Sequence, residues 1–161
     1  MPMLDVTIPE GALAPEAERA LIARLTDLLI AHEGADPTSP RVREVSWVFL
    51  HRPAAVFVGG APEEAPHYRV VPTVPEGQYD DERRQAVVAD VTDAILDAED
   101  GAHPREPSRI WVFPTEMPEG TWGSNGRING LADIADSLFD VEDGQRYAQE
   151  RLAARAAASR V

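Results

Sequence analysis

The sequence predicts an α+β fold in which a β-α-β unit occurs twice along one chain. The first observation is a strand and turn that recur 66 residues later, where Thr7, Pro9, Glu10 and Gly11 return as Thr73, Pro75, Glu76 and Gly77. The second is a short aromatic segment, since Trp47-Val-Phe49 returns as Trp111-Val-Phe113. Self-similarity at a fixed offset is the signature of an internal duplication.

Each unit is predicted to run strand, helix, strand. Pro15 and Glu16 are typical of a helix start, because proline suits the first helical position and an acidic side chain suits the positive end of the helix. In chain order we expect strands at about 3–8 and 42–50 around a helix from 15 to about 32, then strands at about 68–74 and 109–113 around a helix from about 80 to 97.

These elements make a single domain over residues 1–161. It consists of a first unit (2–60), a second unit (67–130) and a C-terminal helical extension (131–161). A right-handed crossover makes the two strands of each unit parallel. We therefore expect a four-stranded core sheet with two helices on one face, plus a C-terminal helix.

The other face of this sheet is also apolar. Residues 42–50 and 109–113 carry apolar side chains on both sides, which is typical of strands that are buried on both faces, and we expect Trp47 and Trp111 in a core. No predicted element is left to cover that second face. We therefore predict a homo-oligomer, a homotrimer, whose sheets turn inward and bury it.

The amino-acid composition excludes several classes of catalytic and binding site. There is no cysteine, and all 15 basic side chains are arginines, so the amino terminus is the only amine. A net charge of -13 disfavours a nucleic-acid partner. No apolar run is long enough to span a membrane and no signal peptide is evident, so we expect a cytoplasmic location. The spacing of His51, His67 and His103 fits no metal site, and we predict neither metal nor cofactor.

Pro2 is the leading catalytic candidate. The initiator methionine is usually removed before a small residue, which leaves a secondary amine at the start of a strand. A free α-amine has a pKa of roughly 7.7–8.0, and burial against apolar walls lowers the pKa. A neutral amine near pH 7 can act as a general base on a proton α to a carbonyl. Alternatively, Met-Pro is only an acceptable start to a strand.

Several further residues are candidates for binding an anionic substrate. Arg127 could hold a carboxylate by a bidentate contact, and Arg69 and Arg43 are weaker candidates. His32 could reach the pocket from the end of its helix, although a solvated histidine there is an ordinary feature. Tyr68 occupies the position in the second unit that Pro2 occupies in the first, so that unit is expected to have a wall or a hydroxyl instead of an amine.

The chain resembles the tautomerase superfamily, which is named for 4-oxalocrotonate tautomerase and includes macrophage migration inhibitory factor. The resemblance rests on Pro2, on residues 47–60, on Ile110-Trp-Val-Phe113 and on the closing segment 115–126, and it covers roughly residues 2–130. The duplicated unit is most similar to cis-3-chloroacrylic acid dehalogenase and malonate semialdehyde decarboxylase. The resemblance implies the tautomerase/MIF-like fold, trimers, catalysis by the N-terminal proline and Trp122 as an aromatic pocket wall.

The substrate-binding arginines of the family are not matched. Ala12, Gln78 and Trp111 stand where arginines are expected, and Phe113 stands in place of a strand tyrosine. The leading hypothesis is a cofactor-free tautomerase, an isomerase that acts by keto-enol proton transfer on a small anionic oxo acid. The alternative is a catalytically silent binding or scaffold protein with this fold. A weaker alternative is a proline-dependent hydratase or dehalogenase on a small unsaturated acid.

Overall fold

A computed structural model of the chain describes residues 2–139 and 141–158 and contains the predicted duplicated sheet. The strand order is β2-β1-β5-β6, and β7 also pairs with β5. The bounds are β1 Met3–Thr7, β2 Trp47–His51, β5 Tyr68–Pro75, β6 Ile110–Val112 and β7 Thr115–Met117. The pairs β1–β2 and β5–β6 are parallel, whereas β1 and β5 run antiparallel and join the two units. The fold class predicted from the sequence is confirmed.

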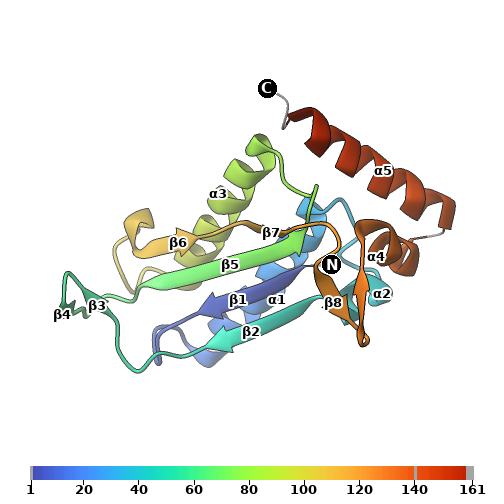
Figure 1. Ribbon diagram of the computed structural model, residues 1–161. Helices are drawn as coiled ribbons and strands as arrows, with labels where there is room; N and C mark the ends of the chain where they lie inside the picture. The colour runs from blue at the N-terminus through green and yellow to red at the C-terminus, as the bar shows by residue number, and fades with distance from the viewer. Residues whose placement is uncertain (1, 140, 159–161) are drawn as a thin grey trace.

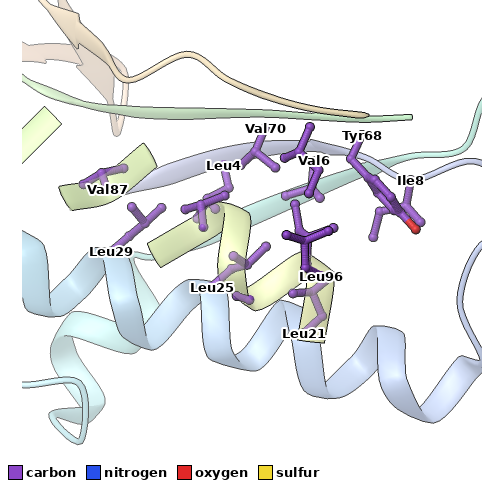
Figure 2. Packing of buried hydrophobic residues seen from close by; sticks show 14 of the residues in the cluster. Leu4, Val6, Ile8, Leu21, Leu25, Leu29, Tyr68, Val70, Val87 and Leu96 are labelled. Atoms are coloured by element: carbon purple, nitrogen blue, oxygen red, sulfur yellow. The ribbon is translucent and has the colours of Figure 1, made fainter. Parts of the chain in front are cut away.

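Two long helices, α1 (Pro15–His32) and α3 (Asp81–Ala98), cover one face of the sheet (Figure 1). Pro15 lies in the first turn of α1, and the Asp80 side chain caps α3 by accepting a hydrogen bond from the Arg83 N–H at 2.8 Å. Figure 2 shows the core between the sheet and these helices, including Leu4, Val6, Ile8, Leu21, Leu25, Leu29, Val70 and Val87. Full burial of a leucine or valine contributes about 1.5–3 kcal/mol.

Two of the expected strands are shorter in the structure. The strand expected at 42–50 begins only at Trp47, because Pro40–Glu44 forms a short helix, α2, with Pro40 in its first turn. A 3-10 helix, Pro107–Arg109, likewise replaces the start of the strand expected at 109–113. Pro114 then interrupts that strand, since proline has no N–H to donate, and pairing with β5 resumes in β7.

Two hairpins and two helices complete the chain. The hairpins are β3 (Phe57–Val58) with β4 (Ala61–Pro62) and β8 (Trp122–Ser124) with β9 (Arg127–Asn129). The C-terminal extension forms α4 (Leu131–Leu138) and α5 (Val141–Ala158), which lie at the same end of the molecule as the amino terminus (Figure 1). No helix among the described residues is long and apolar enough to cross a membrane.

The sheet face opposite α1 and α3 is open within one chain. Trp47 and Trp111 are 62% and 66% exposed there. Trp47 makes an edge-to-face contact with Phe49, and Trp111 makes the same contact with Phe113. The expectation that both tryptophans lie in the core is therefore wrong for the single chain. They face outward because their strands alternate, with Val48 and Val112 turned toward the helices.

Candidate functional site

Pro2 lies buried where β1 begins. Its carbonyl accepts a hydrogen bond from the Trp47 N–H at 3.2 Å, and the next residue, Met3, pairs with both Trp47 and Thr73. Pro2 therefore lies between the start of β2 and the last residues of β5. Buried and partly exposed residues alternate along β1, and Pro2 is on the same side as Leu4, which faces the helices.

Glu33 is a buried carboxyl at this same end of the sheet. It follows α1 directly, its backbone N–H donates to the Leu29 carbonyl at 3.1 Å, and only 2% of the residue is exposed. Burial raises the pKa of the Glu33 carboxyl above its ordinary value, because a charged carboxylate is disfavoured away from water, and the positive amino terminus opposes that rise. The charge that opposes the rise belongs to the amino terminus of the unprocessed chain, one residue before Pro2.

Tyr147 of α5 connects the main chain of Glu33 to the side chain of Gln78. The Tyr147 hydroxyl lies 2.6 Å from both the Glu33 carbonyl oxygen and the Gln78 Oε1, and Gln78 is 1% exposed. A hydroxyl carries one proton, so it donates to only one of two acceptors. Rotating the Gln78 amide by 180° lets its Nε2 donate to the Tyr147 oxygen while the hydroxyl donates to Glu33, which satisfies all three groups.

Tyr79 adds a second buried hydroxyl. The residue is 3% exposed, and its hydroxyl has no hydrogen-bond partner among the described residues. Burial raises the pKa of Tyr79, and the charges of Glu33 and Glu116 raise it further. Glu116 Oε1 fixes the preceding turn by accepting from the backbone N–H groups of Gly77 and Tyr79 at 2.8 and 3.0 Å.

Gly77 permits the close approach of α5 to this turn. Its φ of +92° favours glycine, and a Cβ there would lie 3.3 Å from backbone and side-chain atoms of Arg151. The Arg151 guanidinium lies over the Tyr147 ring, 5.2 Å from its centroid, and Nη2 donates to the Glu33 carbonyl at 3.3 Å. The C-terminal extension therefore reaches the amino-terminal end of the sheet through specific side chains.

The space beside these groups is small. A cavity of about 10 Å³ is lined by the polar residues Glu33, Gln78 and Tyr147 and by Ala35, Leu131, Ile134, Ala135, Leu138 and Phe139. A volume of that size accommodates about one water molecule. An organic acid therefore needs α4 and α5 to move away, or needs additional volume at the amino terminus. Among the described residues, no group of three or more histidine, aspartate or glutamate side chains could hold a metal ion.

The structure brings only some of the predicted binding residues to this end of the molecule. Trp122 and Arg127 lie on the β8–β9 hairpin, close to the amino terminus in Figure 1. Arg127 is exposed, and its Nε donates to Asn129 Oδ1 at 3.1 Å. His32 instead turns to α3, where its Nε2 lies 2.8 Å from Asp90 Oδ2.

Arg69 and Phe113 lie elsewhere on the sheet. The Arg69 guanidinium is 5.9 Å from the centroid of the Phe113 ring, and both side chains are exposed on the open face. Arg69 pairs with Thr7, whereas Pro2 adjoins Met3 at the other end of β1. At about 3.3 Å per residue, this separation is roughly 15 Å along the strand.

Sequence reasoning missed Glu33, Tyr79 and Tyr147. One signal was available: the offset that aligns Thr7 with Thr73 also aligns Glu33 with Glu99, and both glutamates are buried. Tyr147 gave no such signal, because it contacts Glu33 only through the docking of α5.

The comparisons with known proteins concern the family and the fold. Residues 73–131 match the family model described as Tautomerase enzyme. No curated protein matches the sequence. Among solved structures, Pt0534 inactivated by 2-oxo-3-pentynoate is similar, with a TM-score of 0.63 and 22% identity over 79% of this chain and 94% of that one.

Two further structures widen the comparison. A fused 4-OT that forms a symmetric trimer has a TM-score of 0.63 and 23% identity over 83% of this chain and 98% of its own. Macrophage migration inhibitory factor from Toxoplasma gondii has a TM-score of 0.61 and 14% identity over 79% of this chain and 99% of its own. At these identities the likeness establishes the fold and leaves the activity open. The family match of residues 73–131 and the fold of the duplicated body make the chain similar to the tautomerase superfamily.

Proposed function

We propose that the chain is a cofactor-free tautomerase-type enzyme in which Pro2, after removal of Met1, is the general base on a small oxo or enol acid. The observation that carries this proposal is the burial of Pro2 at the start of β1, at the end of the sheet where Glu33 is also buried. With no lysine in the sequence, the amino terminus is the only amine available as a base. A secondary amine held at the end of a strand has a fixed direction, which proton transfer from carbon requires.

The test combines processing with activity. Intact-mass measurement should show that Met1 is absent, because a retained methionine turns the proline nitrogen into a non-basic amide. Exchange of the α-hydrogens of phenylpyruvate in D2O, followed by NMR, measures proton abstraction directly. We expect Pro2→Ala to reduce the exchange rate by about 10²–10⁴-fold, the typical contribution of a general base. Retained methionine, or an alanine variant as active as the parent, contradicts the proposal.

The anionic group of the substrate needs a positive partner in a chain of net charge -13. We propose Arg127 for this contact, with Trp122 as the neighbouring aromatic wall, since both lie on the hairpin at the amino-terminal end. Arg127→Ala should raise KM more than it lowers kcat, because a carboxylate contact is present in the ground state and in the transition state.

We also propose that the molecule is a homotrimer. The exposed aromatic side chains on the open sheet face support burial between copies, and the similar fused 4-OT is a trimer. Arg69 and Phe113 lie on that face, so in a trimer they can contribute to the site of a neighbouring copy. Light scattering that reports a monomer at micromolar concentration contradicts this assembly.

A silent binding or scaffold protein is the second candidate. Two observations favour it: the cavity is about 10 Å³, and Ala12 and Gln78 stand where arginines are expected. This candidate predicts no α-hydrogen exchange above the buffer rate for any small oxo acid, even when Met1 is removed. A proline-dependent hydratase or dehalogenase would instead release a hydrated product or halide from a small unsaturated acid.

A further inference from the structure

The second unit contains residues that correspond to Pro2 and Glu33, so the two positions can be compared directly. The offset of 66 residues that relates the two units aligns Pro2 with Tyr68 and Glu33 with Glu99. Both glutamates follow the long helix of their unit, and both are buried, at 2% and 4% exposure. Tyr68 turns toward the helices, as Figure 2 shows, and its hydroxyl donates to Glu99 Oε1 at 2.9 Å.

The contact between Tyr68 and Glu99 indicates which kind of ligand could bind between Pro2 and Glu33. In the second unit a phenol ring extends from the position of Pro2 and presents its hydroxyl to the glutamate. A phenol has the O–H and sp² carbons of an enol. By the repeat relationship, the first unit has a proline in place of this ring, and removal of Met1 takes a further residue away from the same end of the chain. A small enol or oxo acid held there would present its oxygen to Glu33 as Tyr68 does to Glu99.

The two glutamates differ in the charge of their surroundings. Arg109 donates to both carboxylate oxygens of Glu99, from Nη1 and Nη2, at 2.6 Å each. Burial alone would raise the pKa of Glu99, but the hydrogen bonds from Arg109 and Tyr68 and the charge of Arg109 hold it below its ordinary value. The residue that corresponds to Arg109 in the first unit is Val45, two positions before Trp47 as Arg109 is two before Trp111. The first unit therefore has an apolar side chain at the position of this arginine.

We propose that Glu33 is a catalytic acid that works with Pro2. As Pro2 nitrogen takes the proton from the α-carbon of the bound oxo acid, the Glu33 carboxyl gives its proton to the oxo oxygen. The C–H bond breaks, an O–H bond forms, and the products are the enol, a prolinium and a glutamate. Transfer of the proton from Pro2 back to Glu33 restores both groups without a cofactor. This inference rests on the proposed function, because it assigns the partner of the proline base.

Other titratable or charged groups lie near Glu33 and influence its protonation. They are the amino terminus, Tyr79 from the turn before α3, and Tyr147 and Arg151 from α5. Tyr147 and Arg151 contact the main-chain carbonyl of Glu33, so they hold the residue in position. After removal of Met1 the Pro2 amine and the Glu33 carboxyl would interact, and their protons would leave in two steps that belong to the pair. The reactive form has lost one proton, which predicts a bell-shaped dependence of exchange on pH.

The test is Glu33→Gln, which keeps the size of the side chain and removes its acidic proton. We expect α-hydrogen exchange of phenylpyruvate in D2O to fall by about 10²-fold or more, and the falling limb of the pH profile to disappear while the rising limb of the amine remains. The fold should be retained, as judged by an unchanged or higher Tm, because a neutral amide is easier to bury than a carboxyl.

Glu99→Gln is the matched control. It changes the corresponding residue of the other unit, so we expect a lower Tm but a bell-shaped profile with both limbs in the folded protein. A Glu33→Gln variant that keeps the parental exchange rate within about threefold and both limbs overturns the role of Glu33. If Pro2→Ala is inactive in that case, the proposed function stands without Glu33. If Pro2→Ala is fully active, the proposed function and the role of Glu33 fail together.

Discussion

The two β-α-β units carry the same buried glutamate in opposite electrostatic settings. In the second unit, Glu99 is held between Arg109 and Tyr68, and its pKa is lowered below the ordinary value. In the first unit, burial raises the pKa of Glu33, which lies within the field of the amino terminus. A buried carboxyl costs free energy unless it is paired or neutral. In the second unit an arginine holds the carboxyl in its charged form, whereas in the first unit burial favours the neutral form.

Pro2 and Tyr68, which occupy corresponding positions at the start of the two units, also differ in chemistry. The side chain of Tyr68 is buried inside the second unit, whereas Pro2 is smaller and would bear the amine once Met1 is removed. The family match nevertheless covers residues 73–131, which belong to the second unit and exclude Pro2. The matched segment therefore lies in the unit with the structural ion pair, whereas the proposed chemistry belongs to the other unit.

Breaking the ion pair of the second unit should have the largest effect on stability. Arg109→Met leaves the buried Glu99 carboxylate without its main cation, so we expect the free energy of unfolding to fall by about 3–5 kcal/mol. Adding Glu99→Gln to Arg109→Met should restore part of the loss, because the uncompensated charge is then absent. Denaturant unfolding measures both variants, with Glu33→Gln as the control. A loss below about 1 kcal/mol for Arg109→Met contradicts this account of the second unit.

The same comparison predicts opposite dependences of stability on pH. Because the folded-state pKa of Glu33 is raised, its contribution weakens as the pH rises above the unfolded-state value of roughly 4.3. Because the folded-state pKa of Glu99 is lowered, its contribution is present above that value and is lost as the pH falls through the folded pKa. Glu33→Gln should therefore flatten the stability curve above pH about 4.3, and Glu99→Gln should flatten it below. Denaturant midpoints across this range check both signs, and equal slopes in parent and variants count against them.

An arginine at position 45 tests whether the units are electrostatically equivalent. Val45→Arg introduces the counterpart of Arg109, which should favour the charged form of Glu33 and lower its pKa. The falling limb of the exchange profile should then move to lower pH. At a fixed pH on that limb, the exchange rate should fall about tenfold when the limb moves by about one pH unit. Val45→Met is the control, since it adds length without charge. An unchanged limb in Val45→Arg would mean that position 45 does not reach Glu33.

The sequence predicted the duplicated body correctly because its signals are local and repeated. Helical spacing and the Pro15 start identify α1, and the identical residues at an offset of 66 residues identify β5 and α3. The strand expected from Val42 failed because Pro40 starts a helical turn, which a pattern of apolar residues alone does not reveal.

Of the residues proposed for the site, the sequence indicated Pro2, Trp122 and Arg127 but not Glu33. Glu33 resembles an ordinary helix-end residue until its burial is known, and Tyr147 lies 114 residues away in sequence. His32 is adjacent to Glu33, but its side chain contacts Asp90 of α3. A histidine was chosen as a candidate by residue type, whereas the neighbouring glutamate is the residue that is buried at this end of the sheet.

The smallest expected effect concerns the contact by which α5 closes the first unit. The Tyr147 hydroxyl interacts with the Glu33 carbonyl and the Gln78 amide, and a hydrogen bond of this kind contributes about 0.5–1.5 kcal/mol. Tyr147→Phe keeps the ring contacts with Phe139 and Arg151, so only the docking of α5 should weaken. α5 carries three arginines, Arg146, Arg151 and Arg155, at which trypsin cleaves when the helix opens.

We expect Tyr147→Phe to be cut in α5 about 2–10-fold faster than the parent, while the global unfolding midpoint changes little. If a ligand enters through the cavity of about 10 Å³ beside Glu33, easier opening should also lower KM for phenylpyruvate or leave it unchanged. Tyr68→Phe is the matched control, because it removes the equivalent hydroxyl from the second unit and should affect global stability without exposing α5. Equal cleavage rates in parent and Tyr147→Phe would show that this hydroxyl does not hold α5 closed, and access to Pro2 would then depend on the apolar packing of α4 alone.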